Sequence, residues 1–138
     1  MNIINSKSLL NHNTFKIDVN ADFFSIIQNE EELLELLDHK TIIKKNKFIL
    51  GGGSNVLFTK NINGLVIHNK IKGIKIIREN HQTVDVEIGA GENWDDVVCW
   101  STKNNLYGIE NLSLIPGSVG AAPIQNIGAY GCELKDTF

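Results

Sequence analysis

Residues 115–131 read Ile-Pro-Gly-Ser-Val-Gly-Ala-Ala-Pro-Ile-Gln-Asn-Ile-Gly-Ala-Tyr-Gly, and they decide how the whole chain is interpreted. Small residues gather here around Pro116 and Pro123, a composition that favours neither a strand nor a long helix throughout. Glycine has no β-carbon, so its backbone can approach another group closely. The stretch therefore predicts an irregular segment suited to close backbone contact.

Two further glycine loops, at 51–55 and 89–91, each follow an apolar segment. Successive backbone amides in such a turn can point inward and bind an anion. A pyrophosphate suits that geometry, and the Ser54 hydroxyl and Asn55 amide could add hydrogen bonds. Each loop taken alone is better explained as a tight turn, since glycine is the usual turn residue.

The first glycine loop matches neither of two common nucleotide-binding motifs. A dinucleotide-binding Rossmann loop needs a third glycine followed at once by a helix, whereas Val56 stands there and residues 56–58 favour a β conformation. A P-loop needs Gly-Lys-Ser or Gly-Lys-Thr at its end, which is missing. The loop is therefore neither of these.

The strand signals are short and lie on both sides of the glycine loops. Alternation and β-branched or aromatic residues predict strands at 23–28, 47–50, 74–77 and 83–88, with short apolar segments at 56–58 and 64–68. The alternation of Val84, Val86 and Ile88 predicts one buried face.

Two helices are expected, each with an asparagine cap. The first follows Asn29, with Glu32 placed to accept from the Asn29 amide, and runs to about His39. Its apolar face is expected to consist of Leu33, Leu34 and Leu37. The second follows Asn93 and should bury Trp94, Val97, Val98 and Ser101 on one side. Together these elements predict an α+β fold that begins strand-helix-strand.

The composition excludes several classes of protein. With 138 residues, of which 42% are hydrophobic, the chain fits one domain with a core of useful size. A net charge of −3 argues against general nucleic-acid binding. No secretion signal and no apolar run near the ~20 residues of a membrane span are visible, so a soluble, cytoplasmic protein is expected. Cys99 and Cys132 are expected to be reduced, and His12, His39, His68 and His81 lack metal-site spacing.

Four motifs in order carry a resemblance to a known family. They are Gly-Gly-Gly-Ser-Asn-Val-Leu at 51–57, Gly-Ala-Gly-Glu-Asn-Trp at 89–94, Gly-Ile-Glu-Asn-Leu at 108–112 and the long stretch at 116–131. In order and spacing the chain resembles the UDP-N-acetylenolpyruvoylglucosamine reductases, over about residues 13–136. The first motif alone would indicate only the wider family of flavoproteins with a vanillyl-alcohol-oxidase (PCMH) type of FAD domain.

The resemblance implies an α+β, two-lobed FAD-binding domain over residues 1–138 that is incomplete at its C-terminus. The first lobe would cover about residues 13–70, and residues 71–138 would form part of the second. The cofactor would be held between the lobes.

By the same resemblance, residues 51–55 would hold the FAD pyrophosphate, and residues 116–131 would line the pyrophosphate and the flavin. The implied cofactor-binding residues are Gly51, Gly52, Gly53, Ser54, Asn55, Val56, Gly89, Pro116, Gly117, Ser118, Val119, Gly120, Ala121, Ala122, Pro123, Gln125, Asn126, Ile127, Gly128, Ala129, Tyr130 and Gly131.

Small side chains at Ala121, Ala122 and Ala129 would admit the ring system. Gln125 and Asn126 either contact the ligand or support their own loop. Tyr130 either contacts the flavin or fixes the loop.

The implied reaction is flavin-dependent reduction. NADPH reduces FAD, and the reduced flavin passes hydride to the enolpyruvyl group of UDP-N-acetylglucosamine-enolpyruvate, which gives UDP-N-acetylmuramate for peptidoglycan and hence the cell wall. The expected partners are this UDP-sugar and NADPH, with no nucleic acid, membrane or metal, and the oligomeric state is open.

The family's catalytic arginine, serine or cysteine, and glutamate lie downstream of this segment. No catalytic residue is therefore assigned, and residues 1–138 alone are expected to be inactive. Glu92, Asp95 and Glu110 are interpreted as caps, helix-end charges or solvated side chains. Two alternatives stay open: another FAD oxidoreductase of the same domain type, and a non-catalytic nucleotide-binding remnant.

Overall fold

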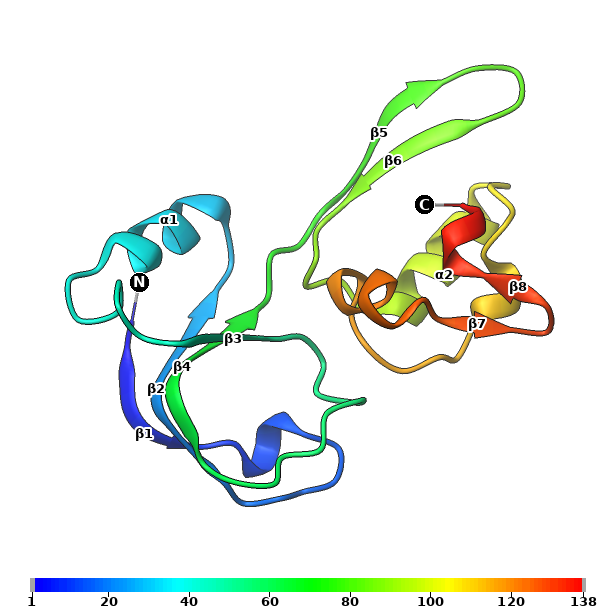
Figure 1. Ribbon diagram of the computed structural model, residues 1–138. Coiled ribbons are helices and arrows are strands. Elements are labelled where there is room, and N and C mark those ends of the chain that lie inside the picture. The colour runs from blue at the N-terminus through cyan, green and yellow to red at the C-terminus, as the bar shows by residue number, and fades with distance from the viewer. Residues whose placement is uncertain (1, 138) are drawn as a thin grey trace. The chain divides into compact units, whose positions relative to one another are not determined.

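The computed structural model describes residues 2–137, which divide into two compact units, residues 2–71 and residues 72–137 (Figure 1). The first unit has one four-stranded sheet and two hydrophobic clusters, and the second has two two-stranded sheets and one hydrophobic cluster. They are described in turn.

The first unit is built on a four-stranded sheet in the order β1-β2-β4-β3. The strands are β1 (Ile4–Ser8), β2 (Asn20–Ile27), β3 (Lys47–Leu50) and β4 (Ile62–Asn69). β1 is antiparallel to β2, and β4 is parallel to both β2 and β3. Leu65, Val66 and Ile67 of β4 are all buried, because a central parallel strand is covered on both faces. The expected segments at 56–58 and 64–68 differ in outcome: the second lies in β4, whereas the first is not a strand.

Helix α1 (Glu30–Asp38) begins as predicted, with the Asn29 side chain accepting a hydrogen bond from the Glu32 N–H at 2.8 Å. The reciprocal bond differs from the prediction. Glu32 accepts from the N–H of Gln28, one residue before the expected Asn29, at 2.7 Å. Its carboxylate therefore anchors the end of β2 to the first turn of the helix.

The buried face of α1 also differs from the prediction. Leu36 is fully buried and Leu34 is 64% exposed, while Leu33 and Leu37 are partly buried. Leu36 packs in a cluster with Ile27, Ile42, Leu65 and Ile67, which come from the sheet and from the turn after the helix. The prediction that Leu34 belongs to the buried face was therefore wrong. The leucines lie on two sides of the helix, and only the side that packs on the sheet is buried.

The second unit opens with a hairpin of β5 (Ile74–Glu79) and β6 (Val84–Ile88), turned by Asn80, whose side chain accepts from the N–H groups of Gln82 and Thr83. Val84, Val86 and Ile88 are partly buried and alternate with the exposed Asp85 and Glu87, so the predicted inner face is present, although it is not fully buried. They line an apolar groove of about 260 Å³ together with Trp100 and other residues of this unit, none of them charged.

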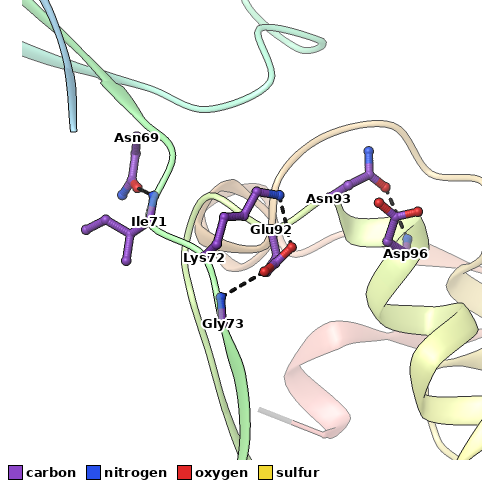
Figure 2. Close-up of polar contacts among 7 residues, drawn as sticks. All are labelled: Asn69, Ile71, Lys72, Gly73, Glu92, Asn93 and Asp96. Atoms are coloured by element: carbon purple, nitrogen blue, oxygen red, sulfur yellow. Dashed lines mark hydrogen bonds and ion pairs between the residues drawn. The ribbon is translucent and has the colours of Figure 1, made fainter. Parts of the chain in front are cut away.

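Helix α2 (Trp94–Lys103) confirms its prediction. The Asn93 side chain caps it by accepting from the Asp96 N–H at 3.1 Å (Figure 2). The residues it buries are those expected from helical spacing: Trp94, Val97, Val98 and Ser101.

After α2 the chain forms short turns instead of long elements. They are 3-10 turns at Glu110–Leu112, Val119–Ala121, Pro123–Gln125 and Leu134–Asp136, with a small hairpin of β7 (Gly128–Ala129) and β8 (Cys132–Glu133); a further such turn, Leu10–His12, lies in the first unit. Trp94, Leu112, Ala122, Ile127 and Leu134 gather with Val98 into the core beneath them. Cys99 and Cys132 are free thiols. Within residues 2–137, none of the helices has the length and apolar character needed to cross a bilayer.

Candidate functional site

The first glycine loop, 51–55, follows β3 and is braced by the segment after β1. Gly53 has a left-handed backbone, φ +69°, and a β-carbon there would lie 2.1 Å from the His12 carbonyl oxygen. The Thr14 N–H donates to the Gly53 carbonyl at 3.1 Å. Only glycine combines this φ with such a close contact at no cost. Gly53 therefore fixes the loop against residues 12–14.

The segment that braces the loop is held by the buried Asn13 side chain, which was not predicted from the sequence. The Asn13 amide donates to the carbonyls of Leu9 and Ile17 at 2.8 and 3.0 Å and accepts from the Ile17 N–H at 3.0 Å. An asparagine that satisfies three backbone groups holds a loop in one shape. Asn13 thus fixes the wall against which Gly53 lies.

His68 supports the same glycine loop from the sheet. It pairs in register with Leu50 at the end of β3 and forms a hydrogen bond to the Gly51 backbone. Its Nδ1 atom is buried and has no hydrogen-bond partner in the described part of the chain. Burial, followed by the charges of Lys70 and His12, lowers the pKa of His68 from 6.5 to about 4. His68 is therefore a neutral imidazole beside the loop at physiological pH.

The His12 ring lies against His68, with ring centroids 5.2 Å apart and the planes nearly perpendicular. Burial and the charges of Lys7 and Lys70 lower the His12 pKa as well. The two residues are far apart in the sequence, and their contact was not predicted. Among the described residues no group of three or more His, Cys, Asp or Glu side chains could hold a metal ion.

In the second unit, the loop 89–93 and the start of the long stretch are joined by backbone hydrogen bonds. Val119 N–H donates to Glu92 O at 3.0 Å, Gly120 N–H to Ala90 O at 2.9 Å, and Trp94 N–H to Gly117 O at 3.1 Å. Asn93 and Ser118 form a β-bridge. The structure therefore brings together the second and third predicted loops.

Ser118 lies at the centre of this junction. Its side chain is buried, and its Oγ atom has no hydrogen-bond partner within residues 2–137. Leaving a buried hydroxyl unpaired costs about 1–3 kcal/mol, so such an atom calls for a partner. Among the described residues of the predicted set, Ser118 is the one with a buried side-chain polar atom that lacks a partner.

The rest of the long stretch divides between core and surface. Ala122 and Ile127 are buried in the core, whereas Ile124 and Tyr130 are 87% and 92% exposed. Asn126 supports its own loop: it has φ +42° and its Oδ1 accepts from the Lys135 N–H at 3.1 Å.

The Tyr130 ring extends from a left-handed position with φ +53°. Two alternatives were given for Tyr130, contact with the flavin or support of its own loop. Its exposure fits the first better, because the ring is open to contact with another molecule.

The Gly108–Leu112 motif acts as support. The buried Trp94 indole donates from Nε1 to the Leu112 carbonyl at 2.8 Å, which fixes this turn on α2. The Glu110 carboxylate accepts from the Gly108 N–H, and this bond lowers the pKa of Glu110. The motif is therefore explained by packing within the second unit.

The acidic residues are backbone acceptors that hold segments together. Asp95 accepts from Leu114 N–H at 2.7 Å and from the Ser113 hydroxyl at 2.9 Å, which lowers its pKa. Glu92 accepts from Gly73 N–H at 2.8 Å and from the Lys72 ammonium at 2.9 Å (Figure 2). The bond from Gly73, followed by that from Lys72, lowers the pKa of Glu92.

Known proteins resemble the chain in both sequence and fold. The FAD binding domain family matches residues 21–138. A UDP-N-acetylenolpyruvoylglucosamine reductase of Flavobacterium johnsoniae is 54% identical over the whole chain and 40% of its own length. One of Photorhabdus laumondii is 51% identical over 94% of the chain and 38% of its own length. The chain thus spans about two fifths of these relatives.

A solved structure shows the same fold. The UDP-N-acetylenolpyruvylglucosamine reductase (MurB) of Thermus caldophilus superimposes with a TM-score of 0.71 at 22% identity, over 98% of this chain and 45% of that one. The predicted α+β fold of the PCMH-type FAD domain is confirmed, and so is the resemblance to UDP-N-acetylenolpyruvoylglucosamine reductases inferred from the four motifs. Another type of FAD oxidoreductase is not favoured. This chain belongs to the FAD binding domain family.

Proposed function

We propose that the chain binds FAD within a protein that uses NADPH to reduce UDP-N-acetylglucosamine-enolpyruvate to UDP-N-acetylmuramate, in the cytoplasm and for peptidoglycan. The family match supports FAD as the cofactor. The reductase relatives support the reaction, which remains a proposal because the chain spans about two fifths of their length. The assignment of residues 13–70 and 71–138 to two lobes of one FAD domain also stays a prediction.

The observation that carries this proposal is the unpaired, buried Ser118 hydroxyl near the start of the predicted cofactor segment. A phosphate or ring-carbonyl oxygen of FAD would complete its hydrogen bonding. The close contacts at Gly53 and Gly120 are with His12 and Ala90 of the chain itself, so these two glycines are explained by packing between segments.

The chain's own residues would bind and orient the cofactor. Bound FAD supplies the hydride-transfer chemistry. In this proposal the backbone of residues 51–55 binds the pyrophosphate, and Ser118 donates its hydroxyl hydrogen. The small, partly buried Ala121 and Ala129 leave room for the ring system, while the buried Ala122 and Ile127 anchor the segment to the core.

The first test concerns Ser118. In the full chain, Ser118→Ala should weaken FAD binding about 3- to 10-fold, the range expected for one lost hydrogen bond, and the change should appear in titrations that follow flavin fluorescence. Thr41→Ala, an exposed residue in the turn after α1, should leave FAD affinity unchanged. Equal affinities of Ser118→Ala and the wild type would refute the role of Ser118.

The second test concerns the pyrophosphate and uses Gly52. A charge at Gly53 is a poor probe, because any side chain there would meet the His12 carbonyl before it met a phosphate. Gly52 is exposed and outside the left-handed region. Gly52→Asp should weaken FAD binding about tenfold, with a smaller loss at high salt, whereas the isosteric Gly52→Asn should do so far less. Similar losses in both variants would argue against a phosphate at this loop.

A further inference from the structure

Glu92 joins three segments of the second unit through its side chain and its backbone. Its side chain accepts from Gly73 N–H through Oε1 and from the Lys72 ammonium through Oε2, at 2.8 and 2.9 Å (Figure 2). Its carbonyl accepts from the Val119 N–H at 3.0 Å, and its own N–H donates to Gly89 O at 2.9 Å. The start of β5, the loop 89–93 and the turn that carries Ser118 are therefore connected at this position.

The two side-chain contacts of Glu92 differ in strength. The Glu92 side chain is 18% exposed, whereas the Lys72 side chain is 52% exposed. A charged acceptor of a backbone N–H makes a stronger hydrogen bond than a neutral one, while an ion pair with a solvated lysine contributes little. The bond to Gly73 is thus the main anchor, and the ion pair with Lys72 is secondary.

Two backbone hydrogen bonds, from Val119 N–H to Glu92 O and from Gly120 N–H to Ala90 O, connect the loop 89–93 to the turn that follows Ser118. Val119 and Gly120 are held only a few ångströms from Glu92 and Ala90, on the C-terminal side of Ser118. If the Glu92 side chain lost its anchor, the loop 89–93 would lose its fixed place relative to β5, and the Ser118 turn would loosen with it. A hydroxyl that must meet a ligand oxygen tolerates little displacement.

We propose that Glu92 is a positioning residue for the FAD site: its carboxylate, by accepting from Gly73 N–H and Lys72, sets the loop that presents the Ser118 turn to the cofactor. This inference rests on the proposed function of the chain. Glu92 itself contacts no cofactor in this proposal. It acts through the backbone of residues 119 and 120.

Three substitutions in the full chain separate the two contacts. Glu92→Gln keeps an oxygen for the Gly73 N–H and removes the charge that pairs with Lys72, Lys72→Met removes only the ion pair, and Glu92→Ala removes both contacts. FAD affinity from flavin fluorescence should fall at least tenfold in Glu92→Ala and no more than about threefold in the other two. Glu87→Ala, which removes an exposed carboxylate of β6, should bind FAD like the wild type.

A spectroscopic measurement distinguishes positioning from general destabilisation. The visible circular dichroism of the bound flavin should change in Glu92→Ala and be restored in Glu92→Gln, because the conservative variant keeps the anchor. If Glu92→Ala does not fold, Glu92→Asp takes its place: its carboxylate is one methylene shorter and cannot hold both partners, so a loss of at least threefold is expected.

The outcomes separate the two proposals. A wild-type chain that binds no FAD would overturn the proposed function and this inference with it. A wild type that binds FAD while the folded Glu92→Ala, or Glu92→Asp in its place, binds equally well would overturn the inference alone. Equal losses in Glu92→Gln and Glu92→Ala would also overturn it, since the anchor to Gly73 would then be irrelevant.

Discussion

Gly120 lies so close to Ala90 that a β-carbon on residue 120 would be 2.6 Å from the Ala90 β-carbon. The same atom would be 3.1 Å from the Ala90 carbonyl oxygen, which already accepts the Gly120 N–H. The loop 89–93 and the start of the stretch 116–131, which are separate motifs in the sequence, are therefore in direct backbone contact. The space between them is too small for even one methyl group.

The contact makes a prediction about Gly120→Ala. The extra methyl group should force the loops apart and lower the free energy of unfolding by about 1–3 kcal/mol, as overpacking generally does. Ala90→Gly combined with Gly120→Ala should recover part of this loss, because the shortest contact is with the Ala90 methyl group. Thermal or urea unfolding of the two single variants and the double variant measures this. Strictly additive effects would show that the two positions do not touch.

A second prediction separates backbone strain from steric contact at Gly53. Gly53→Ala should destabilise the chain by about 2 kcal/mol or more, because the left-handed backbone and the His12 carbonyl both oppose a β-carbon. Gly131 is also left-handed, with φ +81°, but has nothing within 4 Å of its would-be β-carbon. Gly131→Ala should therefore cost only about 1 kcal/mol. Equal losses in urea unfolding would mean that the His12 contact contributes nothing.

A third prediction concerns the pH dependence of stability. The folded-state pKa of His68 is about 4, against 6.5 for an ordinary histidine. Between these values the unfolded state binds more protons, so the free energy of unfolding should fall as the pH drops from about 6.5 toward 4, with a slope of at most ~1.4 kcal/mol per pH unit from this group.

Substitution identifies the source of that slope. His68→Gln should flatten this part of the profile, although His12, whose pKa is also lowered, will leave a smaller slope in the same direction. The exposed Thr41, whose side chain does not titrate, provides the control, and Thr41→Gln should reproduce the wild-type profile. A His68→Gln profile parallel to the wild type would show that His68 titrates normally.

A fourth prediction uses two leucines of α1. Leu36 is fully buried and Leu34 is 64% exposed. Leu36→Ala should lower the free energy of unfolding by about 2–5 kcal/mol through lost burial and a residual cavity. Leu34→Ala, with the same chemistry on the other side of the helix, should change it by less than about 0.5 kcal/mol. The reverse order would mean that the helix packs through its other face.

The helix starts were predictable because they depend on neighbours in the sequence. Asn29 and Asn93 each cap a helix through an N–H three residues later, a contact that needs no knowledge of the rest of the fold. The buried side of α2 was also predictable, since its apolar residues fall on one face only. In α1 the leucines fall on two faces, and the position of the sheet decides which one is buried.

The candidate site was predictable as a set of loops but not as a set of contacts. Glycine-rich segments are visible in the sequence, and the family resemblance assigned them to one cofactor site. The support by His12, Asn13 and His68 was missed, because strand register and backbone turns bring these residues to the loop from distant positions. Asn13 is the one with a visible signal, since asparagine often organises turns.

The order of the first sheet has a consequence for how it can assemble. β4 is made last of the four strands, yet it lies between β2 and β3 and is the only strand that pairs with β3. While a ribosome is still making residues 62–69, the Lys47–Leu50 segment has no strand to bind and β2 has one open edge. The glycine loop that follows Leu50 can therefore take its final place only after the insertion of the central strand, which also delivers His68.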